Sequence, residues 1–257
     1  MSDKLSILKA DEEMNLETTR SKMATGMAAA FFKTLVSSAP LVGPYIAEAM
    51  GVVIPNQKLE RLIIFARVLD DKLKYLKEDT VKLKIETEEF RDLLEDGFIQ
   101  ASRAMTNERR EYIAALLKNS IRNETLDHIE EKKLLALLNE LNDAEILTLK
   151  FYSLSAGGRR EFAEQHKDLF HPIDISHGAP EENIDKGALR DSYRNKLMEI
   201  KLLEPVYKRP EKGKMPEFDE RTGQIKATSV KATWLGKLLL RYIDQDSSTD
   251  HVSPAVE

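Results

Sequence analysis

The chain has no cysteine among its 257 residues. Disulfides, thiolate nucleophiles and cysteine-ligated metals are therefore excluded. Proline and glycine are scarce, at 9 and 11 residues, which argues against long flexible linkers. The first residues mix charges without an apolar run, so they do not read as a secretory signal. We expect a cytoplasmic protein with a sizeable apolar core, and contact with the periphery of the inner membrane stays open.

Charge is almost missing from residues 23–54, which contain only Lys33 and Glu48 as charged residues. A membrane-spanning helix needs about 20 consecutive apolar residues, and this stretch is interrupted too often to supply them. The interruptions are Lys33, Pro40, Gly43 and Pro44. The pattern instead predicts two short helices with a turn between them, over residues 19–38 and 45–50.

This apolar hairpin has two interpretations. It packs into the protein's own helical bundle, as most apolar segments do, or it contacts a protein target or a lipid surface. Its candidate partner- or membrane-binding residues are Phe31, Phe32, Leu35 and Val42.

Apolar residues then recur every three or four positions between Leu59 and Leu76. This is the a/d spacing of a helix that packs lengthwise against another helix. The seam consists of Leu59, Leu62, Ala66, Leu69, Leu73 and Leu76. It suits internal packing or a homo-oligomer. We expect a break between Asp79 and Thr87, with Thr87 capping the next helix.

Further helices follow at short intervals. Their expected N-caps are Thr106 or Asn107, Thr125 and Asn142. The pair Gly157–Gly158 is expected to stop the last of them. Acidic pairs such as Asp70–Asp71 read as solvated helix faces. No strand pattern occurs in the first 155 residues, so this part is predicted to be an all-α bundle.

The C-terminal part changes character. A helix is expected over 185–203, followed by a short strand, a long polar hairpin, a second strand near 224–230 and a final helix. This order resembles a winged helix-turn-helix domain, in which a T-x-x-G-x-x-φ-φ stretch often follows the second wing strand. The matching residues are Thr233, Gly236, Leu239 and Leu240. The predicted domains are an N-terminal extension (1–20), a helical bundle (21–141), a winged-helix-like domain (142–245) and a mobile tail (246–257).

Basic residues gather in this C-terminal part. From Asn183 to Arg241 fourteen Lys and Arg stand against eight Asp and Glu, in a chain whose net charge is −5. The resemblance implies a recognition helix and a basic wing that meet phosphates. The candidate nucleic-acid-binding residues are Arg190, Arg194 and Lys201 on the helix and Lys208 and Arg209 in the wing. Winged helices also bind proteins, so a protein partner stays open.

Signals for catalysis are sparse. The stretch from Arg122 to His128 is similar to the R-x(4–6)-H pattern of HEPN ribonucleases, which implies activation of a ribose hydroxyl. An N-cap at Thr125 would place these two residues on different helices. The set His166, Asp168, His171, Asp174 and His177 offers ligand types that suit Zn²⁺ or Mn²⁺, but in a polar loop without fixed spacing. No motif for a cofactor is present.

One broader resemblance covers Ala28 to Lys150. It is carried by the runs PLVGP, ERREYIAALLKNSI and LLALLNELNDAEILTL. These runs are similar to a loosely defined set of bacterial and prophage all-α proteins, several of which lie among phage-defence or exclusion genes. The resemblance implies a non-enzymatic interaction protein that acts as a phage-defence or superinfection-exclusion factor by binding a protein target or a membrane. It implies no target and no functional residue.

Overall fold

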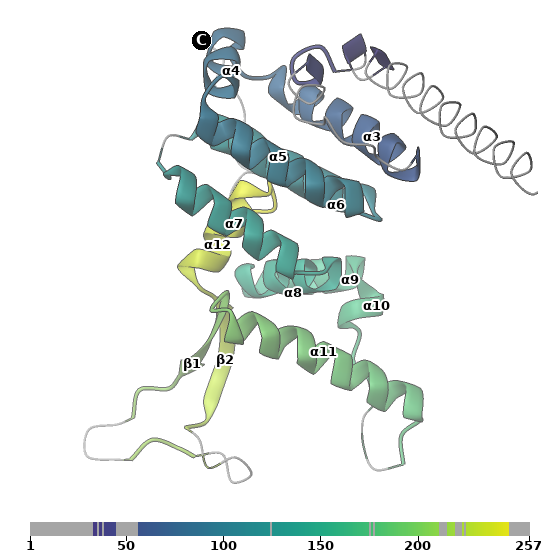
Figure 1. Cartoon of the computed structure of the whole chain (residues 1–257). Helices are drawn as coiled ribbons and strands as arrows, with labels where there is room; N and C mark the ends of the chain where they lie inside the picture. Colours follow the sequence, from purple (N-terminus) through teal and green to yellow (C-terminus); the bar gives the residue numbers. More distant parts are fainter. Residues whose placement is uncertain are drawn as a thin grey trace, which may run out of the picture. The chain divides into compact units, whose positions relative to one another are not determined.

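The computed structural model is mainly helical, with one small antiparallel sheet near the C-terminus (Figure 1). It describes residues 33–34, 36–37, 39–44, 56–123, 125–174, 176, 178–210, 215–218, 223 and 225–246, and only the backbone of 56–59. The mainly helical class is thereby confirmed. Within the described part, strands occur only after residue 200.

The chain divides into two compact units, residues 1–132 and 133–257. The division falls inside helix α7 (His128–Glu140), whereas the boundary expected at 141/142 lies just after the end of that helix. Within residues 56–123, which the structure describes, the helices are α3 (Asn56–Leu73), α4 (Glu78–Ile85), α5 (Glu88–Arg103) and α6 (Asn107–Arg122). Helices α3, α5 and α6 pack against one another, and α4 packs against α5 and α6.

The apolar seam of α3 supplies the core of the first unit. Its members Leu62, Ala66, Leu69 and Leu73 are buried. Phe65, between them, meets Phe98 of α5 edge to face, with 5.1 Å between ring centroids. These residues therefore serve internal packing. The side chain of Leu59 lies outside the described residues.

The structure has two helix breaks where the sequence suggests one. Helix α3 ends at Leu73, so Leu76 lies beyond it, and the first break covers 74–77, before the expected window of 79–87. The second break, at 86–87 between α4 and α5, falls within that window. Helix α4 then occupies most of the stretch in which a break was predicted. Thr87 is the N-cap of α5, as expected, because its hydroxyl accepts from the backbone N–H of Phe90.

The other caps agree only in part. Thr106 caps α6, and Asn142 caps α8 (Asp143–Ser153) in a reciprocal box with Glu145. The cap predicted at Thr125 is wrong. Asp127 holds that place, because its carboxylate accepts from the Glu130 N–H while the Glu130 carboxylate accepts from the Asp127 N–H, at 2.9 and 3.0 Å.

The apolar N-terminal stretch is described only in pieces. Residues 33–34 and 36–37 are helical, and the chain turns at 40–42, where Pro40 was expected to break the first helix. The backbone N–H of Leu41 donates to the carboxylate of Asp70 on α3 at 2.8 Å. Asp70 is fully buried, which corrects its assignment to a solvated face. The expected helix over 45–50 lies outside the described residues.

The second unit combines helices with the sheet. Its helices after α7 are α8, α9 (Ala156–Gln165), α10 (Lys167–Phe170), α11 (Glu181–Glu199) and α12 (Trp234–Tyr242). Its strands are β1 (Leu203–Tyr207) and β2 (Ala227–Ala232). The strands pair antiparallel from Leu203 opposite Ala232 to Tyr207 opposite Ala227, with a register shift after Val206.

Two boundaries in this unit differ from expectation. Gly157 and Gly158 do not stop a helix, because α8 already ends at Ser153 and both glycines lie in the first turn of α9, which Ser155 caps. Helix α11 begins at Glu181, directly after Pro180, and thus four residues before the expected start at Asp185.

The base of the hairpin is joined closely to α12. The Thr233 hydroxyl donates to the carbonyl of Lys201 at 2.8 Å and accepts from the N–H of Gly236 at 3.0 Å, which caps α12. A Cβ on Gly236 would lie 2.4 Å from the Leu202 carbonyl oxygen, so only glycine allows this approach. Leu239 and Leu240 are fully buried. The four residues of the T-x-x-G pattern thus fix the hairpin to the core of the second unit.

Candidate nucleic-acid interface

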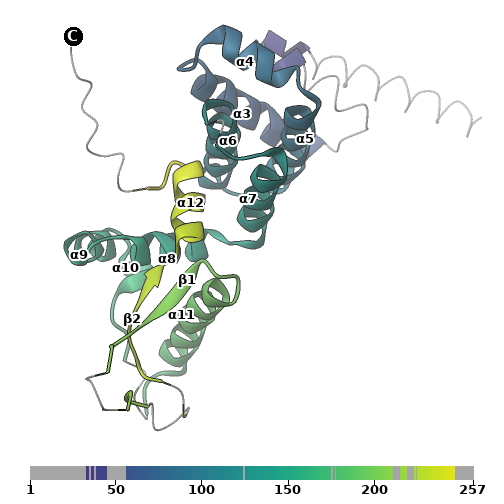
Figure 2. The same ribbon diagram turned by 90° about the vertical axis from the view of Figure 1, so that its left-hand side faces the viewer.

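The hairpin between β1 and β2 carries exposed basic side chains, among them Lys208, Arg209 and Lys226. In Figure 2 the two strands extend away from α8 and α12 toward the turn region. Beyond the strands, Phe218 pairs with Ile225 in an isolated bridge, and the N–H of Lys226 donates to the carbonyl of Glu217 at 2.8 Å. These bonds bring the two arms of the hairpin together past the sheet.

A cleft of about 400 Å³ lies in this part of the hairpin. Its lining residues are Lys208, Arg209, Pro210, Met215, Pro216, Glu217, Ile225, Lys226, Ala227 and Thr228. Three of them are cations and one is an acid. Within the described part of the chain, no ion pair or side-chain hydrogen bond engages Lys208, Arg209 or Lys226. The cleft therefore presents cations that are available to an anionic ligand.

Exposed apolar side chains lie beside these cations. Tyr207, Met215, Phe218 and Ile225 are all exposed. Basic side chains interleaved with aromatic ones are the combination that nucleic-acid surfaces use, since phosphates need charge and bases need a flat apolar partner.

The cations of α11, by contrast, are engaged within the protein. Arg190 donates to the carbonyls of His171 and Asp168, so it fastens the segment that precedes α11. Burial lowers the pKa of Arg190, although a guanidinium stays charged in proteins. The other pairs are Lys186 with Glu182, Arg194 with Asp191, and Lys196 with Glu145.

The structure therefore separates the five predicted nucleic-acid-binding residues. Arg190 and Arg194 lie on α11 as expected, but both are engaged. Lys201 is not on the helix, because α11 ends at Glu199 and Lys201 adopts a left-handed conformation with φ of 63° in the following turn. Lys208 and Arg209 follow β1 directly and are exposed.

A second cleft, of about 320 Å³, lies in the same unit. Apolar side chains of α8 and α10 line it together with Arg190, Asp191 and Arg194 of α11. Phe151 and Phe170 stack within it at 4.6 Å between ring centroids. Both arginines at its wall are engaged, Arg190 with two backbone carbonyls and Arg194 with Asp191.

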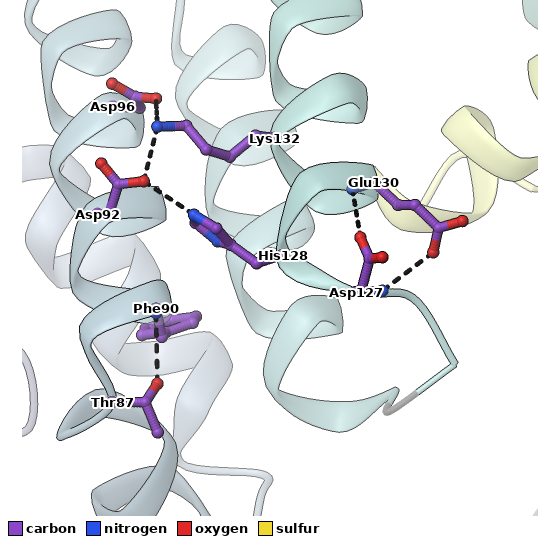
Figure 3. Close-up of polar contacts among 8 residues, drawn as sticks. All are labelled: Thr87, Phe90, Asp92, Asp96, Asp127, His128, Glu130 and Lys132. Atoms are coloured by element: carbon purple, nitrogen blue, oxygen red, sulfur yellow. Dashed lines mark hydrogen bonds and ion pairs between the residues drawn. The ribbon is translucent and has the colours of Figure 1, made fainter.

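The pair Arg122 and His128 lies in the first unit. Arg122 is the last residue of α6 and His128 the first of α7, so the two are on different helices. Figure 3 shows that His128 points to Asp92 of α5, with 2.9 Å between Nε2 and Oδ2. Lys132 donates to the same oxygen at 2.7 Å and pairs with Asp96 at 2.9 Å.

This cluster joins α7 to α5. The hydrogen bond from Lys132 is the main cause that holds the pKa of Asp92 below its usual range; burial opposes it, and the hydrogen bond with His128 lowers the pKa further. Both donors converge on one carboxylate oxygen. His128 therefore has a structural role as a hydrogen-bond partner of Asp92.

The described members of the histidine–aspartate set, His166, Asp168, His171 and Asp174, do not come together as a metal site. His166 packs on the ring of Phe162 at 4.3 Å, and the carboxylate of Asp174 accepts from the N–H of Ser176. In the part of the chain that the structure describes, no three histidine or acidic side chains gather around one point. His177 lies outside that part.

Three of the four candidate residues for a protein or membrane partner, Phe31, Phe32 and Leu35, lie outside the described residues. The fourth, Val42, is fully buried. No helix within the described ranges has the length and apolar content to cross a bilayer.

Comparison of the chain with models of protein families, with curated proteins and with solved structures finds no match. The assignment of function therefore depends on the geometry of the chain itself.

Sequence reasoning missed one conspicuous residue. Trp234, the single tryptophan of the chain, is 86% exposed at the first position of α12. The T-x-x-G pattern indicated that Trp234 starts a helix, but not that its side chain is exposed.

Proposed function

We propose that the protein binds nucleic acid with a winged-helix-like C-terminal unit, and that the β1–β2 hairpin is its principal contact. The order α8, α11, β1, β2 and α12, with the cap of α12 by Thr233 and Gly236, supports the winged-helix-like interpretation. The observation that carries the proposal is the contrast in cations. Lys208, Arg209 and Lys226 line an open cleft without a described acidic partner, whereas the cations of α11 are engaged.

The physical reason is counterion release. A cation that neutralises a phosphate frees a condensed counterion, whereas a cation already paired within the protein must first break that pair. The hairpin cations of the cleft have no such pair to break within the described residues, so each of them contributes more to binding than a cation of α11 does. Binding should therefore be strong at low salt and weaken steeply as salt increases.

Charge reversal at two positions tests the proposal. The variant Lys208→Glu/Arg209→Glu should bind labelled DNA or RNA at least about tenfold more weakly at about 50 mM salt, and the slope of log affinity against log salt should fall by about 2. The matched control Lys186→Glu/Arg194→Glu changes the net charge equally but on α11, and should weaken binding less than about threefold. Circular dichroism checks that both variants fold.

Two results would overturn the proposal. One is the lack of any salt-sensitive binding of the unaltered protein at low salt. The other is an equal loss in the hairpin and α11 variants, which would make the effect one of net charge alone.

The predicted role in phage defence or superinfection exclusion, exerted by contact with a protein target or a membrane, stays a prediction. It depends on the N-terminal residues Phe31 and Phe32, which lie outside the described part. Its test is capture of partners from phage-infected cells with the unaltered protein and with the variant Phe31→Asp/Phe32→Asp. Unchanged partners and unchanged protection in a folded variant would contradict it.

A further inference from the structure

The side chain of Trp234 has no place in the core of the second unit. It is 86% exposed, although an indole is among the largest apolar surfaces that a protein can bury. Isolated exposed apolar side chains are common, but an exposed tryptophan beside cations is a typical feature of binding surfaces.

The local structure forces this exposure. Thr233 caps α12, so Trp234 begins the helix, and the backbone of Gly236 lies against the carbonyl of Leu202. Residues Gly236, Leu239 and Leu240 turn to the core. The helical period then directs Trp234 and Lys237 to the opposite, solvent face.

A cation lies against the indole. The Nζ atom of Lys237 lies over the ring at 5.2 Å from its centroid, a distance at which a cation is attracted by the π-face. Lys201 is joined to the neighbouring Thr233 through its carbonyl. No described partner engages the ammonium group of Lys201. One face of the ring carries an ammonium group, and its high exposure leaves the rest of the ring accessible.

We infer that Trp234 is a stacking platform for an unpaired nucleobase, with Lys237 and Lys201 placed to meet the adjacent phosphates. This inference rests on the proposed function and names the form of nucleic acid, which is single-stranded or has an unpaired base. A base inside a duplex offers no free face, whereas an unstacked base of any kind can lie on an indole.

The position of Trp234 relative to the hairpin cleft supports this. Leu203 pairs with Ala232 at the base of the hairpin, next to Trp234, and Tyr207 at the other end of β1 precedes Lys208. Five residues of strand separate the two sites by about 17 Å. A short single strand is long enough to span this distance.

The single tryptophan makes the test direct, since all indole fluorescence comes from Trp234. An oligothymidylate of about 12 nucleotides, within the size range of single-strand sites, should quench this fluorescence, and the matching duplex should not. Replacement of Trp234 by Leu should weaken binding of the single strand about tenfold to a hundredfold. Binding of the duplex should change less than about twofold. Trp234→Phe should recover part of the loss, because it keeps an aromatic face.

The outcomes separate this inference from the proposed function. If binding depends on Lys208 and Arg209 but neither quenches Trp234 nor changes in Trp234→Leu, the hairpin contact stands and the stacking platform is overturned. Equal effects of Trp234→Leu on single strand and duplex also overturn the platform. If neither form of nucleic acid binds at low salt, both proposals fail.

Discussion

The backbone N–H of Leu41 donates to the Oδ1 atom of the buried Asp70. Asp70→Ala removes the acceptor and leaves a backbone donor without a partner, so it should lower the free energy of unfolding by about 1–3 kcal/mol. Asp71→Ala, one residue along α3, is the control. Asp71 is exposed and pairs with Lys74, so the change should stay within about 0.5 kcal/mol. Urea denaturation of the full chain measures both, and equal losses would contradict the structural role of Asp70.

The close approach of Gly236 to Leu202 predicts that a single added methyl group lowers the stability of the fold. In Gly236→Ala the new Cβ would lie 2.4 Å from a backbone oxygen, and the resulting shift should cost about 1–3 kcal/mol. Gly157→Ala is the matched control, because a Cβ there meets nothing within 4 Å. In the first turn of α9 it should be neutral or stabilise by up to about 1 kcal/mol. Thermal unfolding of the two variants should give shifts of opposite sign or of clearly different size.

Two arginines one turn apart on α11 should behave differently. Arg190→Ala loses two hydrogen bonds to carbonyls of the preceding segment and should destabilise by about 1.5–3 kcal/mol. Arg194→Ala loses one pair within the helix, which is worth about 0.5 kcal/mol. Amide hydrogen exchange should show faster exchange around 168–174 in the first variant only. Similar exchange in both would mean that Arg190 does not fasten this segment.

The cluster around Asp92 predicts a dependence of stability on pH. The folded-state pKa of Asp92 lies below its usual 3.8, so its contribution is fully present above pH 3.8 and is lost as the pH falls through the folded-state value. Asp92→Asn should cost about 0.5–1 kcal/mol at neutral pH, because the carboxylate is half exposed. The difference from the unaltered protein should shrink below pH 3.8. A pH-independent difference for Asp92→Asn would contradict the assignment.

Local patterns predicted most of the helices because the decisive interactions are local. Thr87, Asn142 and Thr233 cap helices through atoms three residues away, a distance that is visible in the sequence. The cap was predicted at Thr125 and lies at Asp127. Residue type alone does not separate the two positions, because both threonine and aspartate cap helices. The reciprocal bond with Glu130 favours Asp127, and that bond follows from the spacing once both ends are considered.

The candidate site was less predictable. The sequence shows that α11 is basic, but not that Arg190 meets carbonyls 19 and 22 residues away in the chain. Burial of Asp70 likewise depends on a donor 29 residues away. Such contacts come from tertiary packing, which periodicity does not encode. The exposed hairpin cations were predicted because a polar strand connection is exposed in nearly any fold.

The hydrogen bonds of Thr233 tie the hairpin to the rest of the second unit. The Thr233 hydroxyl joins the turn at Lys201, the base of both strands and the first turn of α12. The base of the hairpin is thus tied to α12, which Leu239 and Leu240 anchor in the core. A ligand bound at Lys208 would contact a hairpin whose base is fixed to the packed interior of the second unit.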